Sequence, residues 1–197
     1  MSGSCGILAP IVWLMSTRIR AEAFDANSRA DLEVDPVLQE ITALAPIQER
    51  LALFNWLQIA GIVMLILATL GAYLMIKPSG TIASLTLAAI SAGAVLSVAV
   101  RAIDLGVLYA IVPEFIGTAE DANRTGLINS HESIVPVQNL ASDLSLALRS
   151  GIGALLLCVA IIRAGAFPKW FGWVSFVVAI AAWLELVVKM LDTGGDT

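Results

Sequence analysis

The stretch that decides the fold is residues 81–112, which read TIASLTLAAISAGAVLSVAVRAIDLGVLYAIV. Residues 81–100 carry no charged side chain. An α-helix rises ~1.5 Å per residue, so ~20 apolar residues cross the ~30 Å hydrocarbon core of a bilayer. We therefore predict a membrane-spanning helix here, with Arg101 and Asp104 just beyond its uncharged part.

Small residues recur along one face of this predicted helix. Ala89, Gly93 and Ser97 are spaced by four, the small-xxx-small pattern that lets two helix backbones approach closely in lipid. Arg101 and Asp104 continue the same face, at steps of four and three. We expect this face to pack against another helix and the charged pair to point into a helix bundle.

The composition excludes several classes of protein. Of the 197 residues, 58% are hydrophobic and 14% charged, and the mean hydropathy is +0.88. Soluble domains have ~45–50% and ~25% of these residues, so a soluble globular fold is disfavoured. The net charge of −5 argues against nucleic-acid binding. The single histidine, His131, excludes a bis-histidine haem site and a histidine-rich metal site within one chain, and we expect no cofactor and no metal.

The pattern of apolar segments predicts an all-α polytopic membrane helix bundle. Residues 1–17 form a short N-terminal span or half-span, and 18–50 an acidic external segment whose residues 36–44 form an amphipathic helix. Pro46 can open the next helix. The four-helix bundle covers residues 51–191, with a polar tail at 192–197. Its predicted spans are 51–76, the stretch that begins at 81, 144–162 and 170–191.

Charges in the connections set the predicted orientation. The short hairpins at 77–80 and 163–169 contain only basic charges, whereas the predicted long loop at 113–143 and the C-terminal tail are acidic. By the positive-inside rule the short hairpins are cytoplasmic, and the long loops and the C-terminus are external.

Polar side chains gather at one depth in the predicted helices. Counted from the cytoplasmic hairpins at ~1.5 Å per residue, they lie in the outer third of the bilayer or at its outer interface. The members of this predicted polar cluster are Arg101, Asp104, Arg149, Glu185, Lys189, Asn55 and Gln58. Arg101 and Asp104 form an i,i+3 pair, whereas Arg149 has no acidic partner in its own helix and needs a carboxylate or a ligand.

Two interpretations of this cluster stay open. It forms either a pocket for a small anionic or zwitterionic ligand, or salt bridges and snorkelling charges that only fix the bundle. In the predicted long loop, His131, Glu132 and Glu114 are further candidates for a site, but we favour the interpretation that His131 and Glu132 form a solvated loop pair.

No motif indicates an enzyme. The chain lacks a phosphate-binding loop, a GxSxG nucleophile, an HExxH zinc motif and a dinucleotide fingerprint, so no catalytic residue is assigned. We favour a non-enzymatic membrane protein that binds a small ligand, a lipid or a membrane-protein partner at the polar cluster. The alternatives are a structural accessory subunit of a larger membrane complex and a membrane-embedded enzyme that uses Asp104 or Glu185 as base.

Two short segments resemble a bacterial family of small multi-pass membrane proteins of unknown function. These are Val100-Arg101-Ala102-Ile103-Asp104, and the hairpin Ala166-Phe167-Pro168-Lys169-Trp170-Phe171-Gly172-Trp173 before the last span. The resemblance covers roughly residues 50–190. It implies a bacterial inner membrane and supplies no reaction.

Overall fold

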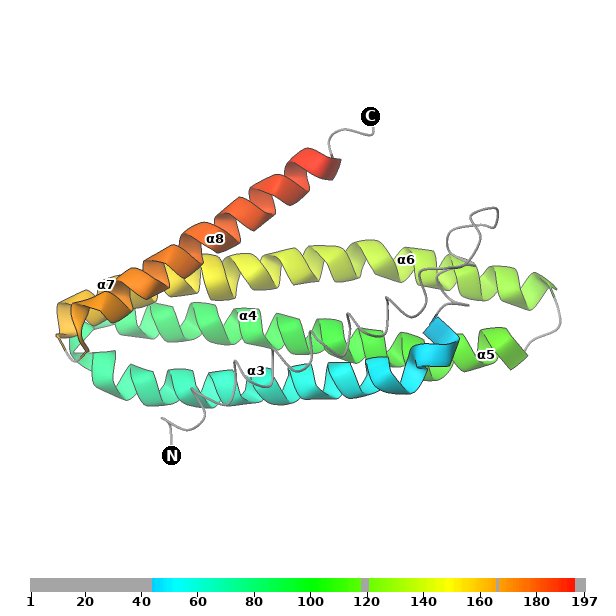
Figure 1. The fold of residues 1–197 in the computed structure, drawn as a ribbon, viewed down its shortest axis with the longest axis horizontal. Helices are drawn as coiled ribbons and strands as arrows, with labels where there is room; N and C mark the ends of the chain where they lie inside the picture. Colours follow the sequence, from blue (N-terminus) through cyan, green and yellow to red (C-terminus); the bar gives the residue numbers. More distant parts are fainter. Residues whose placement is uncertain (1–43, 118–120, 166, 194–197) are drawn as a thin grey trace. The chain divides into compact units, whose positions relative to one another are not determined.

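A computed structural model of the chain describes residues 44–117, 121–165 and 167–193 (Figure 1). Within this part every regular element is a helix, which confirms the predicted all-α fold. The predicted N-terminal span at 1–17, the amphipathic helix except its last residue, Leu44, and the end of the polar tail lie outside the described residues.

The helices follow one another with short connections. In chain order they are η1 (Ala45–Ile47), α3 (Gln48–Ile76), η2 (Lys77–Ser79), α4 (Thr81–Gly106), η3 (Val107–Ile111), α5 (Val112–Gly117), α6 (Asp121–Leu146), η4 (Ala147–Ile152), α7 (Gly153–Ala164) and α8 (Lys169–Thr193). The elements η1 and η2 are 3-10 helices, whereas η3 and η4 are π-helical turns.

Proline and glycine mark the predicted helix ends. Pro46 lies in the first turn of η1, where its missing N–H costs nothing, and so opens the helix as predicted. Gly80 has φ +70° in the turn between α3 and α4, and Gly165 has φ +62° at the end of α7. Only glycine adopts these left-handed conformations without strain, so both predicted hairpins are present.

The predicted long loop at 113–143 is wrong as secondary structure. Residues 112–117 belong to α5, and α6 begins at Asp121 and continues to Leu146. The acidic composition suggested a loop, but Pro136 is accommodated inside α6 and apolar positions of this helix still pack. Leu127 and Ile128 lie against the buried cluster of Val112 and Phe115, and this burial stabilises the helix.

Four helical segments are long and apolar enough to cross a membrane. They are Ala45–Ser79, Thr81–Gly117, Asn123–Ala164 and Lys169–Val188. The first three have 35, 37 and 42 residues, well beyond the ~20 residues that a span needs.

The described chain forms two compact units. We call residues 62–97 with 141–193 unit 1, and residues 44–61 with 98–140 unit 2. Unit 1 has a buried core of Ile76, Ala83, Ala160 and Ile161 from α3, α4 and α7. The core of unit 2 joins Leu51 and Ala52 of α3 to Leu105 and Leu108.

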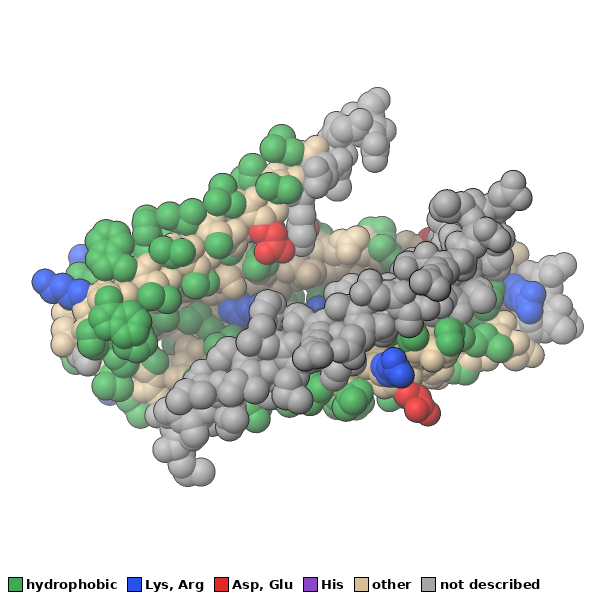
Figure 2. All heavy atoms as spheres, viewed as in Figure 1, with side chains coloured by type: hydrophobic (Ala, Val, Ile, Leu, Met, Phe, Trp, Pro, Cys, Tyr) green, Lys and Arg blue, Asp and Glu red, His purple; other side chains and the backbone are tan. Residues whose placement is uncertain are grey.

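The last helix, α8, contacts the rest of unit 1 along one narrow face. Ala179, Ala182 and Leu186 are buried at helical spacing, and α8 packs on α7 and η4. Most of its other large apolar side chains are exposed, and Figure 2 shows green side chains along this helix. Exposed apolar surface of this extent is typical of sites that contact lipid or another protein.

Candidate functional site

An ion pair lies at the centre of the polar residues of unit 2. Arg101 Nη1 is 2.7 Å from Asp104 Oδ2, on successive turns of α4. The two side chains are 24% and 22% exposed, so water reaches the pair only partly. The i,i+3 contact predicted from the sequence is therefore present.

Two other helices of unit 2 complete this group. From α3, Asn55 Oδ1 accepts a hydrogen bond of 3.4 Å from Arg101 Nη1, and the Phe54 ring centroid lies 5.6 Å from the guanidinium carbon. From α6, Gln138 Nε2 donates to Asp104 Oδ1. The sequence did not reveal the role of Gln138, because residues 113–143 were predicted to be a loop.

The group in unit 2 therefore joins three helices through partnered polar atoms. The charges of Arg101 and Asp104 cancel, and Asn55 is 4% exposed. Nearby, Gln48 Nε2 donates to the carbonyl of Leu108 at 2.7 Å, in the π-helical turn η3. Such contacts specify how helices pack, and they favour a structural role here.

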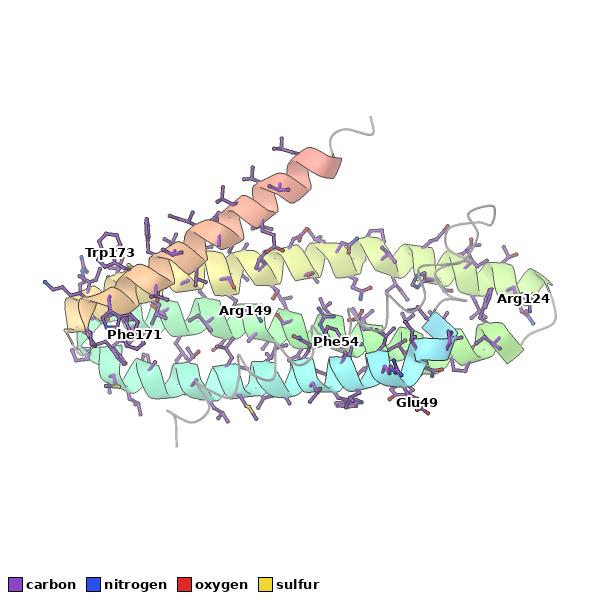
Figure 3. All side chains as sticks on the ribbon, in the orientation of Figure 1. Glu49, Phe54, Arg124, Arg149, Phe171 and Trp173 are labelled. Atoms are coloured by element: carbon purple, nitrogen blue, oxygen red, sulfur yellow. The ribbon has the colours of Figure 1, made fainter. Side chains whose placement is uncertain are left out.

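Unit 1 contains a second polar group, which we call the Arg149 centre: Gly93, Ser97, Ser145 and Arg149. Ser145 Oγ donates to the carbonyl of Gly93 at 2.8 Å, and the hydroxyls of Ser97 and Ser145 are hydrogen-bonded to each other. Arg149 Nη1 donates to Ser97 Oγ at 3.3 Å. Figure 3 labels Arg149, which belongs to the π-helical turn η4.

The backbones of α4 and η4 approach closely at this centre. A Cβ atom on Gly93 would lie 2.7 Å from the backbone N of Arg149 and 2.8 Å from the carbonyl oxygen of Ser145. The predicted small-residue face therefore does pack against another helix. Val95, two residues on, is 63% exposed and faces away, as the helical periodicity requires.

The indole ring of Trp183, from α8, packs against η4. A Cβ atom on Gly151 would lie 3.1 Å from the indole, so the glycine lets α8 pack directly on the π-helical turn. π-Helical turns inside α-helices often mark functional positions, because they redirect side chains and release backbone groups. Here the turn carries the one arginine of unit 1 that lies away from a hairpin.

The other predicted site residues have mixed outcomes. Gln58 is half-buried in α3, and Glu185 is exposed on α8. Lys189 lies in α8, but its side chain is outside the described ones. Arg101 and Asp104 belong to unit 2, whereas Arg149 and Glu185 belong to unit 1, so the convergence of these four side chains stays a prediction.

The residues predicted in a solvated loop lie on helices. His131 is 5% exposed within α6, so the expectation of a solvated histidine is wrong, because its helix packs against neighbouring elements. Its neighbour Glu132 is exposed, as is Glu114 of α5. Among the described residues, no three His, Cys, Asp or Glu side chains gather in a way that could hold a metal ion.

Comparison with known proteins adds no further assignment. No family model, no curated protein and no solved structure matches this chain. The resemblance to a bacterial membrane family therefore stays a prediction, and the site must be interpreted from its own chemistry.

Proposed function

We propose that this chain is a non-enzymatic multi-pass protein of a bacterial inner membrane that binds a small anionic or zwitterionic ligand at the Arg149 centre. Two features support the membrane setting. Four segments are long and apolar enough to span, and large apolar side chains are exposed on α3, α4, α7 and α8. With the basic hairpins on the cytoplasmic side, α6 begins outside and the C-terminus is external.

The depth of Arg149 supports a functional role. It lies 14 residues before Arg163 of the hairpin, or ~21 Å along a helix, which reaches the outer third of a ~30 Å hydrocarbon layer. A charge at this depth is costly, and such charges commonly mark ligand or ion sites. The single observation that carries the proposal is the placement of this arginine on a π-helical turn, beside two serine hydroxyls.

The chemistry of the centre favours an anion. The guanidinium offers a planar fork of N–H donors that matches a carboxylate or a phosphate. The Ser145 hydroxyl donates to the Gly93 carbonyl, so Ser97 donates to Ser145, and Ser97 Oγ accepts from Arg149 Nη1. This chain of hydrogen bonds positions the guanidinium. The low dielectric of the surrounding apolar helices strengthens the attraction between a bound anion and the arginine.

The test is ligand retention during purification. We expect native mass spectrometry of protein from mild detergent to find a small anion on the wild type and to lose it in Arg149→Gln. Arg149→Lys keeps the charge but not the fork and should bind more weakly. The control is Arg50→Gln, an exposed arginine of α3 that lies outside both proposed sites, which should retain the ligand. Equal ligand content in Arg149→Gln and Arg50→Gln would refute the proposal.

A structural accessory subunit is the second candidate, and the surface of α8 favours it. Trp183, Leu184, Val187 and Val188 are all exposed, so the helix presents apolar side chains on several sides. A partner helix could cover this surface in place of lipid. Under this alternative, Leu184→Trp should release a co-purified membrane protein, whereas Arg149→Gln should not.

The enzyme alternative has less support. Asp104 accepts hydrogen bonds from both Arg101 and Gln138, and these contacts hold its carboxylate as the ionised partner of an ion pair. A general base must instead lie within hydrogen-bond reach of a substrate proton, whereas protein donors already contact both carboxylate oxygens of Asp104. These contacts suit a carboxylate that joins helices.

A further inference from the structure

A cavity of about 190 Å³ lies between α3, α4 and α7 of unit 1. Small side chains create it, because Ala68 and Ala72 of α3 lie where larger residues would fill the space between the helices. The lining is almost entirely apolar and extends from Ala68 to Ile76, eight residues or ~12 Å along α3. Ala68 and Ala72 are only half-buried, so the cavity communicates with the surface of the bundle.

The two threonine hydroxyls of the lining are already engaged. Thr69 Oγ1 donates to the carbonyl of Leu65 at 2.8 Å, and Thr86 Oγ1 donates to the carbonyl of Ile82 at 2.8 Å. The hydroxyl protons therefore face their own helices, and the cavity suits an apolar occupant. An engineered apolar cavity of ~150 Å³ in another protein accepts benzene, so this one has room for a section of hydrocarbon chain.

Basic side chains flank the end of the cavity. Ile76, which lines it, is followed directly by Lys77 in η2, and η2 packs on α7, near whose end lies Arg163. Lys169 begins α8 after the second hairpin. All three side chains are exposed, and residues 77–80 and 163–169 contain no acid. Figure 2 shows basic side chains at this end of unit 1.

Aromatic rings lie at the same end of unit 1. The rings of Trp170 and Phe171 stack with their centroids 4.1 Å apart, and the ring centroids of Phe167 and Phe171 are 5.8 Å apart. Trp170 is 58% exposed and Trp173 is 62% exposed. Exposed tryptophans next to lysines are typical of the membrane–water interface. In a bilayer these basic residues would lie at the level of the lipid phosphates, and the cavity extends from Ile76 along α3 to Ala68.

We propose that unit 1 binds one anionic phospholipid, with an acyl chain in the cavity and its phosphate at Lys77, Arg163 and Lys169. This inference rests on the proposed membrane setting but not on the Arg149 centre. The side chains that line an empty cavity lack dispersion contacts on one side, and an acyl chain would supply these contacts. The net charge of +3 at the two hairpins selects an anionic headgroup over a zwitterionic one.

The experiment compares phosphatidylglycerol with phosphatidylcholine on the purified protein, by lipid titration in detergent with native mass spectrometry. The wild type should retain one phosphatidylglycerol more tightly than phosphatidylcholine. Ala72→Leu fills the cavity and should reduce retention of both lipids several-fold. Its matched control is Ala88→Leu on the exposed surface of α4, which should retain both lipids like the wild type.

A second variant tests the headgroup site without altering the core. Neutralising Lys77, Arg163 and Lys169 to glutamine should weaken phosphatidylglycerol binding by about fivefold per charge and leave phosphatidylcholine binding unchanged. Arg50→Gln removes an exposed charge outside the hairpins and serves as its control. Equal affinity of the wild type for both lipids, or full retention by both the cavity and the hairpin variants, would overturn the inference. Arg149→Gln should retain phosphatidylglycerol, so the lipid site and the Arg149 centre can fail independently.

Discussion

Replacing Gly93 by alanine tests the close approach of α4 and η4. The added methyl group would lie 2.7 Å from Arg149 N and from Arg149 Cβ, and 2.8 Å from the carbonyl oxygen of Ser145. Two of these three atoms belong to the backbone, so no flexible side-chain end can move aside. The helices must separate, and the 2.8 Å hydrogen bond from Ser145 to Gly93 must lengthen.

The expected cost follows from three terms. Overpacking costs ~1–3 kcal/mol, and rigid backbone neighbours place this site near the upper value. An interhelical hydrogen bond in a membrane protein contributes ~0.6 kcal/mol. Alanine restores ~1 kcal/mol through its higher helix propensity. The free energy of unfolding of Gly93→Ala should therefore fall by about 2–3 kcal/mol.

Gly106→Ala provides a matched control in the same helix. Gly106 also has helical dihedral angles, but an added Cβ atom there would meet nothing within 4 Å. This substitution should leave the unfolding free energy unchanged or raise it by up to ~1 kcal/mol. Val95→Ala, at a position that is 63% exposed, should also have little effect in detergent.

The assay is reversible unfolding in mixed micelles with increasing sodium dodecyl sulfate, followed by circular dichroism. Each variant is compared with the wild type in the same detergent. Equal unfolding free energies for Gly93→Ala and Gly106→Ala would refute the close packing of α4 on η4. A larger decrease of the unfolding free energy in Gly106→Ala than in Gly93→Ala would also refute it.

Three further predictions concern other parts of the chain. In intact cells, a cysteine at Asn123 should react with a membrane-impermeant thiol reagent and a cysteine at Lys77 should not; the opposite pattern would invert the proposed orientation. In a double-mutant cycle, Arg101→Gln and Asp104→Asn should show a coupling of roughly 1 kcal/mol in unfolding free energy, whereas additive effects would mean that the ion pair adds nothing. Gly165→Ala should cost about 1 kcal/mol, because Gly165 has φ +62°, and an unchanged melting temperature would contradict that conformation.

The sequence by itself determined the positions of the apolar helices and of the hairpins between them. The apolar stretch from residue 81, the glycine and proline residues in the hairpins and the spacing of Ala89, Gly93 and Ser97 all depend on neighbours a few residues apart. Helix periodicity and turn conformation are local properties, so they can be predicted from local sequence. The same reasoning predicted that Arg101 and Asp104 would meet on successive turns.

Prediction from local sequence failed where a polar segment is held in a helix by packing. Residues 121–143 have the polar character of a loop and contain Gly126 and Pro136, yet they belong to α6. Leu127 and Ile128 provide too few apolar positions to reveal a helix in the sequence. Their burial against Val112 and Phe115 supplies the stabilisation that the composition conceals.

Only the tertiary structure decided which residues meet across helices. Nothing in the sequence pairs Gly93 with the backbone of Arg149, Ser97 with Ser145, or Asp104 with Gln138. These partners lie 34 to 56 residues apart in the chain, and their contacts depend on how whole helix surfaces fit together. The hydrogen-bonding capacity of a serine or glutamine is local, but its partner is set by the packing of every side chain around it.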